Sequence, residues 1–311
     1  MNRSGEKQCS NAVLMVRPAA FGFNAETAVT NAFAGRAEEP AVQRQALVEF
    51  DRLVQRLSDA GVDVTVLDDS ADAVRPDAIF PNNWVSFHGD GTMALYPMES
   101  QSRRSERRPA ELAELLQGRG FRVGRTVDLS PLENGGCFLE GTGSLILDRP
   151  RRQAFAALSP RTHADAIAEF DRALGFSTFV FDAADTAGRP IYHTNVLLSL
   201  GTRFALLCID AVVAEQRHGL IERLEESGRT IIPIDFDQLR RFACNMIELE
   251  NGRGERMIAL STSAKQCLRP EQRRALDTLG GELLDADIPT IERVGGGGVR
   301  CMIADIHLPR G

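Results

Sequence analysis

Short apolar stretches alternate with longer amphipathic segments along the whole chain. The stretch 12–16 is apolar throughout, as is typical of a buried strand. In 46–57 the apolar side chains recur at helical spacing, and Gly61 marks the end of that predicted helix. The alternating segment 62–67 predicts another strand. The chain therefore begins with a strand, a helix and a strand.

A longer unit of two short strands, a helix and a strand then follows four times. The predicted elements are strands 84–88, 92–96 and 121–123 with a helix near 106–117; strands 143–147, 153–157 and 179–181 with a helix from Thr162, where a capping-box pattern stands; strands 192–200, 203–210 and 230–234 with a helix over 214–227; and strands 246–249, 257–261 and 289–292 with a helix from Pro270. Five units of roughly 50 to 60 residues predict an α/β fold in a closed cyclic array. An open doubly wound sheet is the alternative, but it needs a phosphate-binding glycine fingerprint after its first strand.

The domain organisation follows from the absence of a Pro/Ser-rich linker or a low-complexity segment. We expect one domain over residues 11–311, preceded by a disordered stretch over residues 1–10. The sequence does not settle the oligomeric state, and a homodimer stays open.

Composition and charge exclude several classes of function. The 311 residues are 43% hydrophobic and 25% charged, with a formal charge of −7, which argues against a nucleic-acid surface. No apolar run approaches the ~18 residues of a membrane span, and no signal peptide begins the chain, so we expect a cytoplasmic protein. The six cysteines and five histidines show no disulfide or zinc spacing. We predict no metal and no cofactor.

A run of four glycines, 295–298, stands shortly before Cys301. Without Cβ atoms this backbone lets a substrate or another loop approach closely. Residues 301–308 predict a strand that would hold Cys301 at the edge of a rigid sheet. We therefore consider Cys301 a candidate nucleophile; a flexible glycine loop beside an ordinary buried cysteine is the alternative.

Polar residues in three other segments could act together with this cysteine. His193 and Asn195 lie two residues apart in the apolar stretch 191–198, so a strand would point both to one face. Glu140 precedes a glycine-rich turn, and the segment 77–84 contains Asp77 and the pair Asn82-Asn83. These side chains could converge in a cyclic fold. The alternatives are a satisfied core histidine, a turn acid and ordinary turn asparagines.

Taken in order, these motifs resemble the guanidine-modifying, or pentein, superfamily, which includes arginine deiminases, dimethylarginine hydrolases and amidinotransferases. Within it the chain is most similar to the citrulline-utilisation hydrolases. The resemblance spans Val13 to Asp305, and its carriers are Arg17-Pro18, the segment 77–84, Ser102-Arg103-Arg104, the segment 139–143, Ser159-Pro160-Arg161-Thr162, His193-Thr194-Asn195 and the segment 296–301. It implies a five-bladed α/β propeller of ββαβ modules with pseudo-fivefold symmetry.

The resemblance also implies roles for individual residues. Cys301 matches the nucleophile, His193 the general acid and base, and Glu140 the carboxylate that holds a substrate nitrogen. Arg161 and Arg103 match arginines that bind the α-carboxylate of an amino-acid substrate, although either could be a surface charge.

Two departures from the deiminase pattern bear on the substrate. Asn83 and Asn195 stand where deiminases place aspartates beside the guanidinium group. Amides suit a neutral ureido group better than carboxylates do, because they both accept and donate hydrogen bonds. Asp77 remains as an acid, and Asn82 adds a further amide.

The sequence therefore predicts a cysteine-dependent hydrolase that converts L-citrulline into ornithine, ammonia and CO2 through a thiocarbamate on Cys301. The expected partner is a small amino-acid substrate, with neither nucleic acid nor membrane. An arginine deiminase, a dimethylarginine hydrolase or an amidinotransferase of the same superfamily is the alternative. A non-enzymatic binding protein on the same scaffold is more remote, since it would not need Cys301, His193 and Glu140 together.

Overall fold

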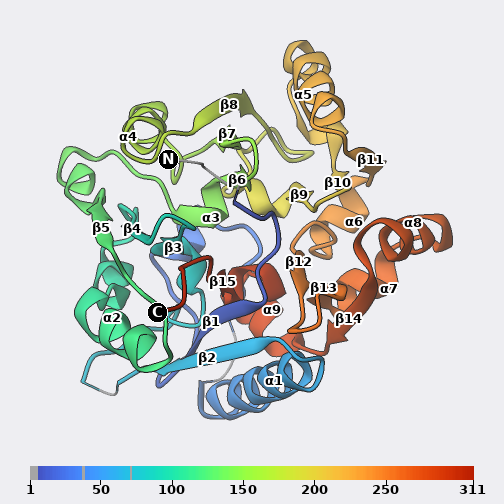
Figure 1. Cartoon of the computed structure of the whole chain (residues 1–311). Helices are drawn as coiled ribbons and strands as arrows, with labels where there is room; N and C mark the ends of the chain where they lie inside the picture. The colour runs from blue at the N-terminus through green and yellow to red at the C-terminus, as the bar shows by residue number, and fades with distance from the viewer. Residues whose placement is uncertain (1–5, 37–38, 71) are drawn as a thin grey trace.

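The computed structural model describes residues 6–36, 39–70 and 72–311. Its described residues form five three-stranded sheets with helices between them. The sheets succeed one another around the molecule in chain order, as the colours in Figure 1 show. The α/β class and the five repeated units predicted from the sequence are confirmed.

All five sheets share one plan. A strand pairs antiparallel with a second strand, which pairs parallel with a third. Four sheets use consecutive strands: β3 (Val85–Phe87), β4 (Thr92–Leu95) and β5 (Arg125–Asp128); β6 (Ile146–Asp148), β7 (Gln153–Leu158) and β8 (Ser177–Asp182); β9 (Leu198–Leu200), β10 (Phe204–Leu207) and β11 (Thr230–Pro233); β12 (Ile247–Glu250), β13 (Arg256–Ser261) and β14 (Glu282–Ala286).

The remaining sheet joins the two ends of the chain. It contains β1 (Ala12–Arg17), β2 (Asp63–Asp68) and β15 (Ala304–Asp305), with Val13 opposite Asp305. The last strand of the chain thus completes the first sheet, and this brings the residues before β15 to the centre of the molecule (Figure 1).

Helices connect the parallel strands of each sheet. They are α1 (Glu39–Asp59), α2 (Pro109–Gly118), α4 (Ala164–Leu174), α5 (Ala214–Glu226) and, for the last sheet, α7 (Thr262–Cys267) and α8 (Pro270–Gly280). In α4 the apolar residues Ile167, Phe170 and Leu174 are buried, and Gly175 ends the helix at φ 70°. The core consists of such contacts between helix faces and sheets.

Short helical segments precede the first strand of each sheet and turn toward one another. They are η2 (Pro81–Asn83) before β3, α3 (Gly141–Ser144) before β6, η5 (Thr194–Val196) before β9, α6 (Phe236–Arg240) before β12, and α9 (Pro289–Gly295) with η7 (Val299–Met302) before β15. Contacts join η2 to α3 and η7, and α3 to η5. Four more lie in loops: η1 (Thr27–Val29), η3 (Gln101–Glu106), η4 (Ser130–Gly135) and η6 (Ile209–Ala211).

Several strand predictions were wrong, and most of them fall in these central segments. Residues 289–292 belong to α9, residues 301–308 contain only the short β15, and 192–200 keeps only β9. In the third unit α3 and β6 replace the strand over 143–147, and β5 begins at Arg125, after the predicted 121–123. The apolar character of 191–197 arises from burial around the centre, which a short helical turn satisfies as well as a strand does. The capping box predicted at Thr162 is also absent, since His163 is the N-cap and makes no side-chain cap.

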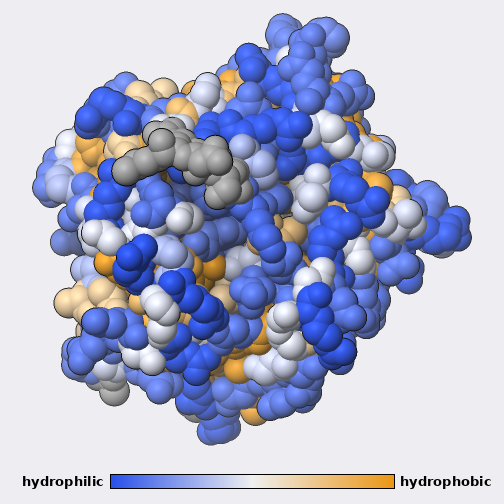
Figure 2. Space-filling model, viewed as in Figure 1, coloured by the Kyte–Doolittle hydropathy of each residue, from blue (hydrophilic) through white to orange (hydrophobic). Residues whose placement is uncertain are grey.

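The N-terminal stretch differs from expectation where it is described. Residues 1–5 lie outside the described residues, but residues 6–10 pack on the fold. Glu6 lies 2.7 Å from Arg149, and Gln8 donates to the carbonyl of Leu147 at 2.9 Å. The surface in Figure 2 is mostly hydrophilic, with hydrophobic residues in scattered patches. None of the described helices is long and apolar enough to cross a membrane.

Candidate active site

Cys301 lies in η7, at the centre of the molecule, and is 3% exposed. The glycines before it make this position possible. A Cβ on Gly295 would stand 2.8 Å from the Phe80 ring, and Gly296 has φ 64°. The prediction that the glycine run permits close approach is therefore confirmed, although a turn of helix, and not a strand, holds the cysteine.

Two asparagine amides contact the sulfur of Cys301. The Nδ2 atoms of Asn195 and Asn245 donate to Sγ at 3.4 and 3.2 Å. Asn245 also accepts a bond from the backbone N–H of Cys301, at 3.3 Å. Burial raises the pKa of the Cys301 thiol, and the two amides and Arg300 act in the opposite direction.

His193 and Glu140 form a buried pair, and they are the N-cap residues of η5 and α3, respectively. The His193 Nε2 atom lies 2.8 Å from Oε2 of Glu140. Burial lowers the pKa of His193 to about 4, against the effect of Glu140. Burial raises the pKa of Glu140, but Arg161 and His193 outweigh it and bring the value to about 2. The histidine is therefore neutral and donates from Nε2 to an ionised carboxylate, which leaves Nδ1 as a base.

Two glycines allow these segments to meet. A Cβ on Gly141, at φ 47°, would lie 2.3 Å from the carbonyl oxygen of Asn82. A Cβ on Gly143 would lie 2.6 Å from Nδ2 of Asn83 and 2.9 Å from the His193 ring. The turn after Glu140 thus requires glycine, because a larger residue would prevent the contact between η2, α3 and η5. The sequence alone did not show this requirement.

Asp77 and the asparagine pair come from the segment that ends in η2. Asp77 accepts from Asn24 at 2.8 Å and from Thr27 at 3.0 Å, both before α1. Asn83 lines the central cavity, whereas Asn82 lies behind it and accepts the Asn83 amide at 3.0 Å. The structure therefore places Asn82 in support of Asn83 and not on the cavity wall.

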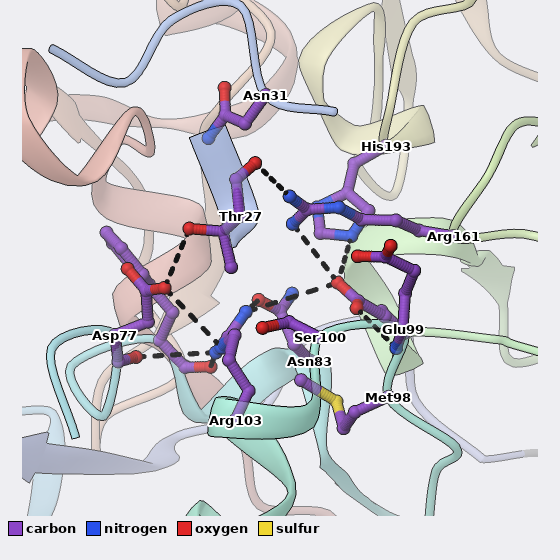
Figure 3. A network of polar contacts seen from close by, with 12 residues as sticks. Thr27, Asn31, Asp77, Asn83, Met98, Glu99, Ser100, Arg103, Arg161 and His193 are labelled. Atoms are coloured by element: carbon purple, nitrogen blue, oxygen red, sulfur yellow. Dashed lines mark hydrogen bonds and ion pairs between the residues drawn. The ribbon is translucent and has the colours of Figure 1, made fainter. Parts of the chain in front are cut away.

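The two arginines predicted to bind a substrate carboxylate are 2% exposed and face inward. Arg103 makes a two-pronged contact with Glu106 at 2.8 and 2.9 Å and donates to Asn83 at 2.7 Å. Arg103 is also 3.9 Å from Asp77 and 4.0 Å from Glu140. Figure 3 shows its guanidinium group between the two sides of this network.

Arg161 completes the network from the other side. It donates to the hydroxyl of Thr30 at 2.8 Å and to the carbonyl of Thr27 at 2.7 Å, and it lies 3.4 Å from Glu140. Its guanidinium group stands 5.2 Å from the centre of the Tyr192 ring. Both arginines thus neutralise buried carboxylates when no substrate is bound.

The side chains around Cys301 enclose a cavity of about 10 Å³, the room of roughly one water molecule. Its walls include Thr27, Asn31 and Tyr192 from outside the predicted set. An amino acid can enter only if one wall moves. A wider cavity of about 1040 Å³ lies away from Cys301, and its walls include Glu6, Cys9 and His307. Burial and the neighbouring Glu248 carboxylate raise the pKa of the Cys9 thiol, which disfavours a thiolate nucleophile there.

Sequence reasoning missed Asn245, Thr27, Asn31 and Tyr192. Asn245 had a usable signal, because it stands just before the first strand of its unit, as Asn83 and Asn195 do. Thr27 and Asn31 come from an irregular loop with no such signal. Within the described residues, no group of three or more His, Cys, Asp or Glu side chains is placed to hold a metal ion.

Comparisons with known proteins agree with this geometry. Residues 17–308 match the family model described as N,N dimethylarginine dimethylhydrolase, eukaryotic. No curated protein sequence matches the chain significantly.

Among solved structures, the N-terminal domain of ArgZ, as a variant covalently bound to a reaction intermediate, aligns with TM-score 0.73 at 18% identity over 96% of this chain and 99% of that one. Full-length ArgZ, an arginine dihydrolase from the ornithine-ammonia cycle in Cyanobacteria, gives 0.75 at 18% identity over 96% of this chain but only 41% of its own. A dimethylarginine dimethylaminohydrolase bound to S-methyl-L-thiocitrulline gives 0.61 at 16% identity, over 96% and 99%.

These names refer to arginine and dimethylarginine, so they support the arginine and dimethylarginine alternatives better than the prediction of citrulline. The relatives are hydrolases of guanidino groups, in agreement with the predicted class of enzyme. The breadth of the family match confirms the predicted resemblance, and the chain belongs to the dimethylarginine dimethylhydrolase family of the guanidino-modifying, or pentein, superfamily.

Proposed function

We propose that this chain is a cysteine-dependent hydrolase that releases ammonia from the terminal carbon–nitrogen bond of a ureido or guanidino amino acid. The observation that carries the proposal is that Cys301, with two amide donors on its sulfur, and His193, bonded to the buried Glu140, line one cavity. We place this activity in a single five-bladed propeller domain over residues 11–311 of a cytoplasmic protein.

Each chemical role has a group to perform it. The Cys301 thiolate attacks the planar carbon and forms a C–S bond, and the leaving nitrogen takes a proton and departs as ammonia. His193 first takes the Cys301 thiol proton on its free nitrogen and passes it to the leaving nitrogen. It then removes a proton from water, which attacks the same carbon, and returns that proton to the sulfur as the C–S bond breaks. Glu140 holds the imidazole through Oε2, and its Oε1, which accepts the Glu99 backbone N–H at 3.1 Å, keeps a lone pair for a substrate N–H. Thiolate, imidazole and water complete the reaction between them.

L-citrulline is the substrate we propose first. The polar side chains in contact with the Cys301 sulfur are amides, and the carboxylates of the site, Asp77 and Glu140, already have arginine neighbours. A neutral ureido group leaves the pairing of these carboxylates with the arginines unchanged, because it adds no charge to the site. The oxygen Oδ1 of Asn195 is buried and lacks a partner among the described residues, so it can accept from a substrate N–H. Citrulline would yield ornithine, ammonia and CO2 through a thiocarbamate.

L-arginine is the second candidate. The similarity to ArgZ favours it, as does the presence of two carboxylates near the cavity. With arginine the first adduct would be a thiouronium on Cys301, and its hydrolysis would give citrulline. Dimethylarginine, after which the family is named, would release dimethylamine in the first step instead of ammonia.

The test is ammonia release from L-citrulline and L-arginine side by side, with dimethylarginine as a third substrate and amino-acid products identified. Ornithine from citrulline, absent in Cys301→Ser, would establish the first proposal. Ornithine or citrulline from arginine alone would establish the second. An amidine or carbamoyl product formed only when an amine acceptor is added would point to a transferase, and no turnover with no Cys301 alkylation would contradict the enzyme proposal.

A further inference from the structure

We propose that Asn245 is a catalytic residue of this site, whose side-chain amide donates a hydrogen bond to the Cys301 sulfur and stabilises the thiolate. The inference rests on the proposed function, since it assigns a role within the same reaction. Asn245 belongs to the linker between α6 and β12, a part of the chain that no motif of the sequence marked.

Asn245 contacts the nucleophile segment at three points. Its Nδ2 donates to Cys301 Sγ at 3.2 Å, and its Oδ1 accepts from the Cys301 backbone N–H at 3.3 Å. Its backbone oxygen accepts from the N–H of Arg300 at 3.3 Å. Because Oδ1 is fixed by the backbone N–H, the amide group must turn its nitrogen toward the sulfur. The residue is 1% exposed, so water does not compete for these bonds.

The place of Asn245 in the fold supports a role in the site. In every sheet, the residues just before the first strand lie toward the centre. Asn83 precedes β3, Glu140 precedes β6 and His193 precedes β9. Asn245 stands two residues before β12, and Cys301 stands three residues before β15. Each of the five units therefore contributes at least one polar side chain to the same region. Asn245 is the side chain contributed by the unit that contains β12.

The backbone around Asn245 is constrained to bring it there. Phe242, three residues earlier, has φ 58°, which strains a bulky residue and is retained only where the surroundings enforce it. The carbonyl of Phe242 accepts the N–H of Asn245 at 2.8 Å, and its ring packs 5.0 Å from Phe33. A Cβ on Gly298 would lie 2.9 Å from Oδ1 of Asn245. The position of the Asn245 amide beside Cys301 thus requires local backbone strain at Phe242 and a glycine at position 298.

The chemistry explains why the amide is needed. Burial disfavours a thiolate, and Arg300 is the charged group that acts against this effect. The cavity beside Cys301 is also lined by the titratable or charged side chains of Asp77, Arg103, Arg161, Tyr192 and His193. Arg300 is engaged with Asp305 at 3.4 Å and with the carbonyl of Ile303 at 2.7 Å. Two neutral N–H donors, from Asn195 and Asn245, stabilise the negative sulfur without adding a charge. These donors stabilise the thiolate when it attacks the substrate carbon. They stabilise it again when the C–S bond breaks and the sulfur leaves with the electron pair.

The experiment measures alkylation of Cys301 by iodoacetamide as a function of pH, followed by mass spectrometry of the Cys301 peptide. No substrate is needed, so the outcome does not depend on the proposed function. Asn245→Asp keeps the acceptor for the Cys301 N–H but replaces the donor with a carboxylate oxygen, and Asn245→Ala removes both groups. We expect the midpoint of the alkylation profile to rise by about one to two pH units in Asn245→Ala, and further in Asn245→Asp.

A matched control separates this effect from a general loss of packing. Asn251→Ala removes a buried asparagine near β12 that bonds with Glu255, away from Cys301. We expect its alkylation midpoint to equal that of the wild type. An unshifted midpoint in both Asn245 variants would overturn the proposal, and so would equal shifts in Asn245→Ala and Asn251→Ala. If Asn245→Asp does not fold, Asn245→Ala decides the question at a temperature where its thermal unfolding curve shows it folded.

Discussion

The central site has a charged side and a neutral side. On the charged side, Asp77 and Glu140 share the guanidinium groups of Arg103 and Arg161. On the neutral side, the Cys301 sulfur is contacted by the amides of Asn195 and Asn245. Both sides are buried to a similar extent, so burial alone does not explain the difference.

The comparison shows that the fold neutralises its own carboxylates before any substrate binds. Isolated buried carboxylates would cost several kcal/mol each, and the two arginines offset most of that cost. The same solution is unsuitable beside the sulfur, where a carboxylate would oppose the thiolate. Amides stabilise the sulfur without adding a charge. The two sides can therefore be altered separately, and this leads to the predictions that follow.

The largest effect is expected on the neutral side, from Cys301→Ser. The alkoxide of serine forms far less readily than a thiolate, so ammonia release should fall by about 10⁴-fold or more. A coupled ammonia assay measures this. Cys137→Ser, a substitution in the half-buried Cys137 away from the cavity, should leave the rate unchanged. Equal losses in both variants would mean that Cys301 is not the nucleophile.

On the charged side, Glu140→Gln should reduce kcat by about 10²–10⁴-fold. The substitution removes the negative charge that faces His193 and Arg161 and leaves the shape of the side chain nearly unchanged. Steady-state kinetics with the active substrate would show the loss. Glu133→Gln is the matched control, because Glu133 is bound to Arg107 outside the cavity. A kcat within a few-fold of wild type would show that Glu140 is only structural.

Asn195→Asp tests the boundary between the two sides, because it places a carboxylate beside the sulfur. We expect the ratio of kcat/KM for arginine to kcat/KM for citrulline to rise by about 10- to 100-fold, since a buried hydrogen-bond mismatch costs about 1–3 kcal/mol. The thiolate would also form less readily, so absolute rates should fall. Asn11→Asp adds the same charge at an exposed position and should leave the ratio unchanged. If Asn195→Asp also leaves it unchanged, Asn195 does not select the substrate.

The sequence was sufficient to predict the five repeated units, the close approach at the glycine run, and the proximity of Cys301, His193 and Glu140, of which Cys301 and His193 line the cavity and Glu140 lies against His193. These predictions depend on local chemistry or on the order of elements. The contacts that bring the segments together were not predictable, because they depend on distances across the molecule. The inward direction of Arg103 and the supporting position of Asn82 are examples.

The errors in secondary structure share one physical cause. Residues 191–197 and 301–303 are apolar and buried, and the sequence pattern of a short buried strand does not differ from that of a buried helical turn. The centre of this fold favours turns, because the chain must change direction there before each first strand. Asn245 was missed for a related reason: it stands in a linker where asparagine is common for turn chemistry alone.

The smallest effect concerns the pH dependence of stability and comes from the charged side. Burial lowers the pKa of His193 to about 4 in the folded protein, below the ordinary value of 6.5. The unfolded chain therefore binds more protons at this residue between about pH 6.5 and pH 4, and the free energy of unfolding should fall as pH falls through that window. Glu140, with a pKa of about 2, adds its own loss only at lower pH, between about 4.5 and 2.

His193→Asn should flatten this dependence by up to about 1.4 kcal/mol per pH unit, since a neutral amide does not take up a proton. Urea unfolding at pH 7, 6 and 5 measures the slope. His88 is also buried with its pKa lowered, to about 3, so part of the slope should remain in the variant. His218→Asn, at an exposed position on α5, should leave the slope as it is in the wild type. An unchanged slope in His193→Asn would mean that His193 binds the same number of protons in the folded and unfolded chain, so that its pKa is not lowered in the folded protein. A steeper slope would mean that the charged side holds His193 as a cation beside Glu140.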